Sequence, residues 1–354
     1  MLEPIARGRN RRSRIALIAS AIVVSAALAL TGCSAGSGSA AESSGTSAEA
    51  GAFPVTITSA LGSVTIEKKP ERVAVWGWGA QDVALALGVV PVAMPKMTYG
   101  GDADGVLPWD ADAIEKLGGT TPELLTGADS DQVPFEQFVK AKPDVILAPL
   151  SGLSQKDYDT LSKIAPVVAY PKQIWGTSWQ DQTAIVGKAL GKQAEATALR
   201  KATEEKVAAL GAKYPVLKGK TFLYAAANQP GQLNVYKATD TRVLLLNELG
   251  LTNSPSLKAL DPKADGSFFY QLSYENLSKI DTDVLVMYFD KQAAVDAFTS
   301  DPLVAAMPTV AEGRFAPIVG ESFVMASSAP SVLSIPWMLD RYVPKLAAAA
   351  DKVE

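Results

Sequence analysis

The sequence contains no histidine and a single cysteine, Cys33. Without histidine the chain has no Ser-His-Asp or Cys-His nucleophile, and no zinc or copper site that depends on imidazole. One cysteine excludes disulfides within the chain, iron–sulfur clusters and metal sites built from several thiolates. These two absences remove most of the nucleophilic and metal-binding chemistry that a chain of 354 residues could carry.

Composition and charge exclude further classes of protein. The fractions of hydrophobic residues, 48%, and of charged residues, 20%, are typical of a folded globular protein. The chain has 33 Lys and Arg against 37 Asp and Glu; removing residues 1–32, which we interpret below as a signal peptide, takes away five arginines and one glutamate and leaves about −8. A negative chain does not favour nucleic acid as a partner.

The N-terminus has the features of an export signal. Five arginines between residues 7 and 14 precede the apolar run Ile15–Leu30, which is shorter than the roughly 20 residues of a membrane span. A basic segment, a short apolar segment and small residues at the end are typical of a secretory signal peptide. The ending Leu30-Thr31-Gly32-Cys33 resembles the bacterial lipobox, which implies cleavage before Cys33 and a lipid attached to it.

A segment of low complexity follows the cysteine. Residues 34–52 are mainly Ser, Ala, Gly and Glu, with no aromatic residue and no aliphatic residue larger than Ala, so they have nothing with which to form a core. We expect residues 33–52 to be a flexible linker that ties the folded part to the extracellular face of the cell membrane. The pair Arg11-Arg12 leaves open whether export uses the Sec or the Tat route.

The folded part has three regions. Residues 53–178 and 215–354 are each expected to form an α/β lobe, because strand-like runs alternate there with helical ones, as in βαβ units around a mostly parallel sheet. Residues 179–214 are expected to be a helical connection, interrupted at Gly191, whose second helix would be about 30 Å long at 1.5 Å per residue. Early in the first lobe we expect strands at Arg72–Trp76 and Val89–Ala93.

The two lobes contain a weak repeat. Phe135–Lys140 followed by Asp144–Ile146 aligns without a gap with Tyr274–Lys279 followed by Asp283–Leu285, with identical Glu, Lys, Asp and Val. Four identities can also arise by chance between two βα units. If the repeat is real, two similar lobes flank the helical connection, and a cleft between lobes is where ligands tend to bind.

Several segments together resemble one family of transport proteins, and their order matches over most of the folded part. The segments are Lys69–Val75 leading to Ala84–Val89, Lys142–Ala148, Leu161–Val167 and Leu277–Leu285. The chain resembles the iron-chelate and vitamin B12 family of ABC-transporter solute-binding proteins. The resemblance implies two Rossmann-like α/β lobes joined by a long rigid helix, the class III arrangement, with a ligand clamped between the lobes by a monomer. It also implies delivery to a permease and its ATPase, and a lipid anchor as in Gram-positive bacteria.

Large aromatic residues gather where ligands are expected. In α/β sheets that place is outside the carboxyl ends of the strands, and six aromatic residues lie in predicted loops or strand ends: Trp76, Trp78, Tyr99, Trp109, Trp175 and Trp179. Each of them could instead fill a core. Together they suggest an aromatic wall for a bulky ligand. From the second lobe we add Tyr236 and, as weaker candidates in a predicted polar loop, Phe268, Phe269 and Tyr270.

One arginine stands where a cation is locally unfavourable. Arg242 falls in the first turn of a predicted helix that Asp240 or Thr239 can cap, and a positive charge there opposes the helix dipole. Arg242 is therefore a candidate for binding an anionic group of the ligand. A solvated arginine or an ion pair with Asp240 are the alternatives. Lys96 and Lys237 are weaker candidates of the same kind.

Two glutamates occupy matching places in the repeat. Glu136 and Glu275 each lie in the first turn of a predicted helix, where the dipole alone favours a carboxylate. The family resemblance implies a further role, since such proteins use one glutamate per lobe to dock onto arginines of the permease.

These observations favour a receptor for a ferric siderophore. Iron would arrive inside its chelate, so the protein needs no cofactor and no metal ligand of its own, which fits the lack of histidine and thiolates. A cobalamin or haem receptor of the same family is the nearest alternative, although haem usually requires a His or Tyr ligand. An enzyme on this scaffold is a more distant alternative, since we find no nucleophile or cofactor loop. A structural lipoprotein is another distant alternative. The sequence does not distinguish catecholate, hydroxamate and mixed chelates.

Overall fold

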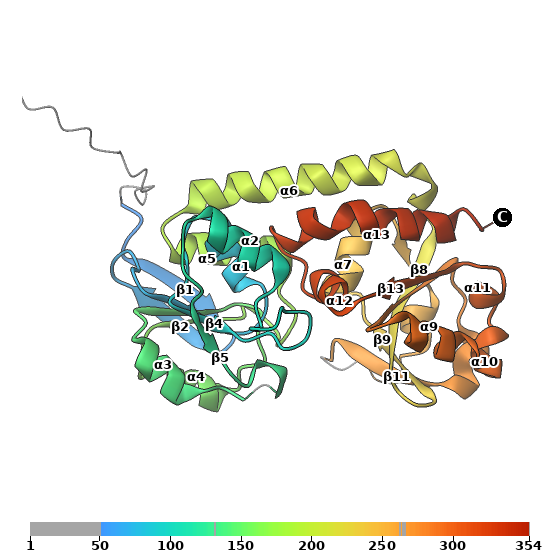
Figure 1. Cartoon of the computed structure of the whole chain (residues 1–354), viewed down its shortest axis with the longest axis horizontal. Helices are drawn as coiled ribbons and strands as arrows, with labels where there is room; N and C mark the ends of the chain where they lie inside the picture. Colours follow the sequence, from blue (N-terminus) through green and yellow to red (C-terminus); the bar gives the residue numbers. More distant parts are fainter. Residues whose placement is uncertain (1–50, 131, 262, 264–266, 354) are drawn as a thin grey trace, which may run out of the picture. The chain divides into compact units, whose positions relative to one another are not determined.

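The computed structural model describes residues 51–130, 132–261, 263 and 267–353. The predicted signal peptide, Cys33 and the linker up to residue 50 lie outside the described residues. The described part belongs to one compact unit, Thr46–Glu354, in which two main sheets are each packed against helices (Figure 1). No helix among the described residues is both long enough and apolar enough to cross a membrane.

The first lobe is built on a five-stranded sheet in the order β5-β4-β3-β6-β7, with every neighbouring pair parallel. Its strands are β3 (Val73–Val75), β4 (Ala93–Pro95), β5 (Glu123–Leu125), β6 (Val145–Ala148) and β7 (Val167–Ala169). Its helices are α1 (Ala80–Ala86), α2 (Pro108–Lys116), α3 (Phe135–Ala141), α4 (Gln155–Leu161) and the 3₁₀ turn η1 (Ala128–Ser130). An antiparallel hairpin of β1 (Val55–Ser59) and β2 (Gly62–Ile66) precedes the sheet. All four residues of β6 are buried, as expected for a strand covered on both faces.

One predicted strand of this lobe was wrong. We expected a strand at Val89–Ala93, but β4 begins only at Ala93. The backbone N–H of Val89 donates to the carbonyl oxygen of Ala84 and so closes the end of α1. Pro91 has no N–H to give to a neighbouring strand.

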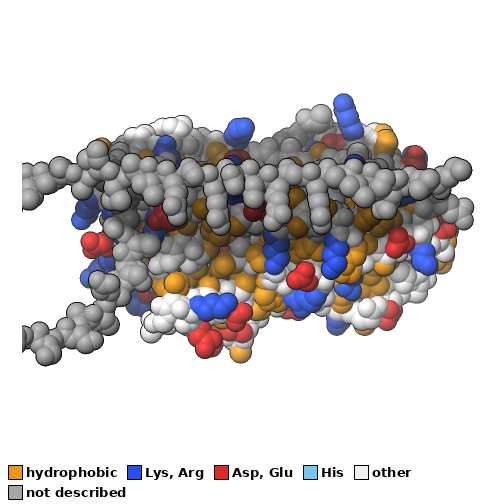
Figure 2. Space-filling view, turned by 90° about the horizontal axis from the view of Figure 1, so that it is seen from above, with side chains coloured by type: hydrophobic (Ala, Val, Ile, Leu, Met, Phe, Trp, Pro, Cys, Tyr) orange, Lys and Arg blue, Asp and Glu red, His pale blue; other side chains and the backbone are white. Residues whose placement is uncertain are grey.

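The helical connection consists of α5 (Trp179–Ala189) and α6 (Gln193–Lys213). The break falls at Gly191, whose φ of +64° is left-handed, a conformation that glycine adopts at little cost. α6 runs beside the last helix, α13 (Ser334–Ala350), along one side of both lobes (Figure 1). Seen from that side, basic and acidic side chains are interspersed with hydrophobic ones in the described part (Figure 2).

The second lobe has a mixed sheet in the order β11-β9-β8-β12-β13, with β10 parallel to β8. Its strands are β8 (Thr221–Gln229), β9 (Gln232–Tyr236), β10 (Thr252–Asn253), β11 (Phe269–Ser273), β12 (Val284–Phe289) and β13 (Phe315–Val319). The helices before α13 are α7 (Thr241–Glu248), α8 (Ser256–Ala259), α9 (Gln292–Thr299), α10 (Pro302–Ala305), α11 (Pro308–Ala311) and α12 (Glu321–Ser328), with 3₁₀ turns η2 (Pro215–Leu217) and η3 (Tyr274–Lys279). β8, β12 and β13 are parallel, whereas β9 and β11 are antiparallel to their neighbours. The expected loop at Phe268–Tyr270 was therefore wrong, since Phe269 and Tyr270 start β11.

The repeat has the same structural role in both lobes. The carboxylate of Asp144, just before β6, accepts backbone hydrogen bonds from Glu71 at 2.8 Å and Arg72 at 3.0 Å, just before β3. Its counterpart Asp283, just before β12, accepts the backbone N–H of Thr221 at 2.7 Å, at the start of β8. In each lobe one aspartate thus fixes the starting points of two adjacent parallel strands.

One hydrophobic cluster extends across both lobes, in addition to a separate cluster within each lobe. The shared cluster of buried side chains includes Val75 and Leu147 of the first sheet, Tyr224 and Val286 of the second, and Leu339 of α13. Because protein interiors are close-packed, a change in the angle between the lobes would disrupt these contacts. We therefore describe the two lobes as halves of one packed body.

A pair of buried aspartates lies where the lobes meet. Asp82 of α1 accepts hydrogen bonds from the hydroxyl of Ser331, in the second lobe, and from the indole N–H of Trp109 at 2.7 Å. Asp110 of α2 is equally buried, and one oxygen of each carboxyl has no hydrogen-bond partner among the described residues. Burial raises the pKa of Asp82 to about 6, and burial together with the Asp82 carboxylate raises the pKa of Asp110 well above its usual value.

Replacing Asp110 by Asn should make stability less dependent on pH. A carboxyl group whose pKa rises on folding stabilises the protein below its unfolded pKa of 3.8, and that contribution is lost as the pH rises through about 6. The wild type should lose on the order of 1–3 kcal/mol through this pair over that window. The variant should lose less, because an amide does not titrate and only Asp82 then contributes. The amide can still accept from Gln81, as Asp110 does, and can donate to Asp82.

Urea unfolding at pH 4.5, 6 and 8 measures this difference. The exposed Asp296→Asn serves as the matched control. A pH dependence of Asp110→Asn equal to that of the control would contradict the raised pKa of Asp110.

Candidate functional site

A pocket of about 490 Å³ lies between the two lobes, within the range of small-molecule sites, about 300–1,000 Å³. The first lobe contributes a largely apolar wall of six residues: Trp78, Met97, Tyr99, Ala128, Leu150 and Trp175. The second lobe contributes apolar and aromatic residues, Phe268, Tyr288, Val324 and Met325, and polar ones, Asn228, Thr241 and Ser328. The charged residues of the wall are Asp240, Arg242 and Asp290.

The topology of the first sheet positions Trp78. The strand order reverses between β3 and β6, and the loops after these two strands meet at that point, which is where α/β sheets typically bind ligands. The backbone N–H of Trp78 donates to the carbonyl oxygen of Leu150 at 2.9 Å. Gly77 allows this approach: its φ is +84°, and a Cβ atom there would lie 2.2 Å from the Leu150 oxygen.

Trp175 is held in a strained backbone conformation. Its φ of +56° is left-handed, which for a side chain of this size costs on the order of 1–3 kcal/mol. Its backbone N–H donates to Ser151, and its ring packs on Trp78 with centroids 4.8 Å apart and planes inclined at 45°. Both indoles are partly exposed and line the pocket. This backbone conformation places the indole of Trp175 against that of Trp78, so the two rings form an aromatic pair on the wall.

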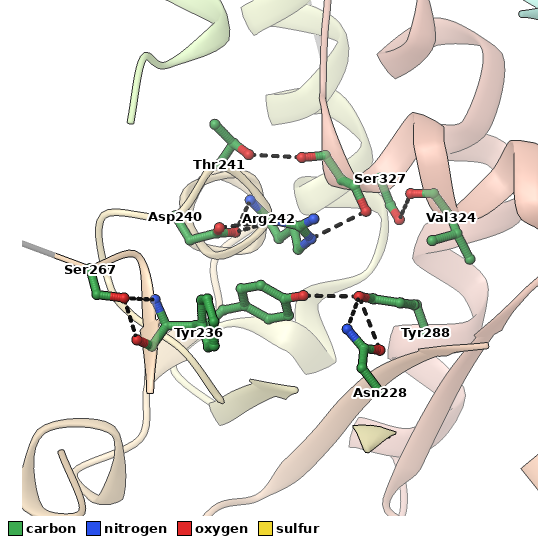
Figure 3. Close-up of polar contacts among 11 residues, drawn as sticks. Asn228, Tyr236, Asp240, Thr241, Arg242, Ser267, Tyr288, Val324 and Ser327 are labelled. Atoms are coloured by element: carbon green, nitrogen blue, oxygen red, sulfur yellow. Dashed lines mark hydrogen bonds and ion pairs between the residues drawn. The ribbon is translucent and has the colours of Figure 1, made fainter. Parts of the chain in front are cut away.

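The second lobe places a buried ion pair in the wall. Arg242, in the first turn of α7, donates through Nη1 to both carboxylate oxygens of Asp240, at 3.2 and 2.9 Å. Its Nε donates to the hydroxyl of Ser328 at 3.2 Å, and its guanidinium lies 4.3 Å from the ring centre of Tyr236. Figure 3 shows this network beside the bonded hydroxyl groups of Tyr236 and Tyr288, 3.0 Å apart. Of the roles considered above, the ion pair with Asp240 is present.

Burial dominates the electrostatics of this network. It raises the pKa of Asp240, and the neighbouring Arg242 only partly offsets that rise. Burial alone would lower the pKa of Arg242, but Asp240 and the surrounding tyrosines outweigh it, so the pKa ends above its usual value. Burial likewise raises the pKa of Tyr236 well above its usual value. Arg242 is therefore a permanent cation, and Tyr236 keeps its hydroxyl proton.

Two hydrogen bonds connect the lobes beside the pocket. The hydroxyl of Tyr99 donates to the carboxylate of Asp290, which follows β12. The hydroxyl of Ser322 in α12 donates to the carbonyl oxygen of Gly100 at 2.7 Å. Burial, followed by the bond to Asp290, raises the pKa of Tyr99. These contacts hold the two walls at a fixed separation.

Four of the predicted aromatic residues do not line the pocket. Trp76 is 2% exposed and packs edge-on against Phe138 in the core of the first lobe. Trp109 and Trp179 are buried, and their indole N–H groups donate to Asp82 and Glu248 respectively. Tyr236 is buried beneath Arg242. A buried indole needs a hydrogen-bond partner for its N–H. Here the partners are carboxylates that are distant in sequence, so the sequence alone does not show that these tryptophans are buried.

The other candidates divide in the same way. Trp78, Tyr99, Trp175 and Arg242 meet at the pocket, and Phe268 joins them. Phe269, Tyr270, Lys96 and Lys237 lie outside its wall. Lys237 forms an ion pair with Asp261 at 3.0 Å.

Sequence reasoning missed Tyr288 and Asp290. Both lie at the carboxyl end of β12, which is where α/β sheets typically bind ligands.

The two predicted docking residues lie away from the pocket. Glu136 and Glu275 are exposed in the first turns of α3 and η3, at matching places in the two lobes. Among the described residues, no group of three or more Cys, Asp and Glu side chains is placed to hold a metal ion.

Two α/β lobes with a shared core, a helical connection and a pocket between them define a solute-binding protein. Residues 73–318 match the periplasmic binding protein family, and the chain belongs to it. The crystal structure of PiaA from Streptococcus pneumoniae TIGR4 in complex with ferrichrome is similar, with 38% identity, a TM-score of 0.78, and coverage of 85% of this chain and 100% of that one.

Two further proteins are similar to this chain. Staphylococcus aureus SirA, complexed with staphyloferrin B, is 26% identical with a TM-score of 0.64, over 82% of this chain and 98% of its own. The Fe(3+) dicitrate-binding periplasmic protein FecB of Escherichia coli is 26% identical over 255 residues, which are 71% of this chain and 78% of FecB.

Replacing Arg242 by Met should destabilise the fold by about 3–5 kcal/mol, because Asp240, 1% exposed, would remain buried without its partner. The double variant Arg242→Met/Asp240→Asn should regain at least about half of that loss, since Asn can still cap α7. Urea unfolding measures both values. A double variant no more stable than the single one would show that the ion pair is not the main effect.

Proposed function

We propose that this protein is a lipid-anchored receptor that binds a ferric siderophore between its lobes and delivers it to an ABC permease for iron uptake. The observation that carries the proposal is the pocket: it is large, mostly apolar and aromatic, and built from both lobes of a solute-binding fold. Such a wall suits a bulky chelate, which presents its organic shell rather than its metal. The ligands named with its relatives, ferrichrome, staphyloferrin B and Fe(3+) dicitrate, support the same class of ligand.

Iron is the cargo in this proposal, and the siderophore supplies its ligands. The chain has no histidine, and the described residues include no group of three or more Cys, Asp and Glu side chains placed to hold a metal ion. The protein binds and releases its ligand unchanged, without catalysis and without a cofactor of its own.

The shared core sets the mode of binding. Because one hydrophobic cluster joins both lobes and Tyr99 bonds to Asp290 across the pocket, we propose that the ligand enters a preformed site with little closure. A preformed site avoids the cost of ordering the protein at each binding event.

The location is part of the proposal. We propose that residues 1–32 are removed, that Cys33 carries a lipid, and that the linker of residues 33–52 holds a monomer at the extracellular face of a Gram-positive cell membrane. The lipobox-like ending of the signal supports this arrangement.

Replacing Trp175 by Ala should weaken siderophore binding by about 10- to 100-fold, as for an aromatic anchor at the centre of an interface. The physical reason is the loss of one half of the Trp78–Trp175 pair on the wall. Quenching of tryptophan fluorescence by ferric siderophores, with cobalamin as a competitor, measures the affinity. Trp337→Phe is the control, because Trp337 packs on Trp109 outside the wall. Equal effects of both variants would contradict the assignment.

Glu136 and Glu275 are proposed to dock onto the permease. Both are exposed, one per lobe, as recognition by a partner with two similar halves requires. The double variant Glu136→Ala/Glu275→Ala should reduce cellular uptake of radioactive iron at least about tenfold, while the dissociation constant of the siderophore stays unchanged. Replacing the exposed Glu67 and Glu205 by Ala is the matched control. Loss of binding in the double variant would place these residues in the ligand site instead.

A further inference from the structure

The charged residues on the pocket wall bear on the net charge of the ligand, which the proposed function leaves open. Three charged residues line the pocket: Arg242, Asp240 and Asp290. One guanidinium against two carboxylates gives a formal charge of −1. The internal residues outside the description, 131, 262 and 264–266, contain no Lys or Arg that could add a cation.

The positive charge of Arg242 is already neutralised by an ion pair with Asp240. Nη1 of Arg242 is 2.9 Å from Oδ2 of Asp240, and both side chains are almost completely buried. Such a pair presents a dipole, not a net charge, to a ligand. Nη2 of Arg242 has no hydrogen bond within the part of the chain that the structure describes, so it remains a donor for a neutral oxygen acceptor of the ligand.

The second carboxylate forms no ion pair with the described residues. Asp290 is exposed at the edge of the pocket and accepts a hydrogen bond from the uncharged hydroxyl of Tyr99. Lys291 follows Asp290 in the chain but lies outside the described pocket wall. Lys237 also lies outside that wall and is paired with Asp261.

We propose, on the basis of the proposed function, that the pocket selects ferric chelates without net negative charge, of the tris-hydroxamate class, and that Asp290 is a specificity-determining residue. Three hydroxamates balance the charge of Fe³⁺, whereas three catecholates leave a charge of −3. A trianion would lose its hydration next to an uncompensated carboxylate and would gain no free cation. A neutral chelate avoids that repulsion, buries its carbon shell against the indoles, and accepts from Nη2 of Arg242.

The first experiment compares ferrichrome, a neutral tris-hydroxamate, with ferric enterobactin, a trianionic tris-catecholate, in fluorescence titrations of the wild-type protein. Ferrichrome should bind at least about 100-fold more tightly, and the ratio should shrink as salt is raised from about 0.05 to 0.5 M, because salt screens the repulsion at an exposed carboxylate. If ferric enterobactin binds as tightly or more tightly, the charge selection is wrong although the receptor function stands. If neither chelate nor ferric citrate binds, the receptor function fails as well.

The second experiment separates charge from shape. Asp290→Asn removes the charge and keeps an oxygen that can accept from Tyr99, so it should lower the ratio of the two affinities at least about tenfold, mainly by improving the trianion. Asp296→Asn removes an exposed carboxylate elsewhere on the same lobe and is the matched control. This control should leave the ratio unchanged. An unchanged ratio in Asp290→Asn, or an equal shift in the control, would overturn the role of Asp290.

Discussion

The continuity of the hydrophobic core across both lobes is the constraint on which the rest of this structure depends. Side chains from both sheets and from α13 belong to one cluster, while α6 runs alongside both lobes (Figure 1). The two sheets are therefore already packed together through side chains, and no ligand is needed to bring them into contact. Its dimensions are set by packing, and the hydrogen bonds from Tyr99 and Ser322 add local fixation at the pocket.

Within that frame the pocket walls are built from locally unfavourable features. Trp175 has a left-handed backbone, Gly77 brings two loops into contact, and Arg242 opposes the dipole of α7. Each is stabilised by a neighbour: the ring of Trp78, the carbonyl oxygen of Leu150 and the carboxylate of Asp240. Such features persist where surrounding contacts over-determine them, and they cluster at binding sites.

The family, the α/β fold class and the helical connection were predictable from sequence, because they depend on local periodicity and on the order of short segments. α5 and α6 interrupted at Gly191 illustrate this. The antiparallel pairing of β11 with β9 was not predictable, because Phe269–Ser273 and Gln232–Tyr236 are distant in sequence. The same limit explains why only some of the predicted aromatic residues line the pocket. Trp78 and Trp175 do so. Trp109 and Trp179 are buried instead, because the carboxylates of Asp82 and Glu248 accept their indole N–H groups.

The aspartate pair at the lobe junction has a consequence for any thermodynamic study of this protein. Asp82 lines a small cavity of about 10 Å³ together with Trp78, Met97 and Met325, three residues that also belong to the main pocket. A ligand that displaces any of these shared side chains changes the surroundings of the Asp82 carboxyl, whose pKa burial raises to about 6. Association is then coupled to proton exchange with the buffer, so calorimetric heats will vary with the ionisation enthalpy of the buffer chosen.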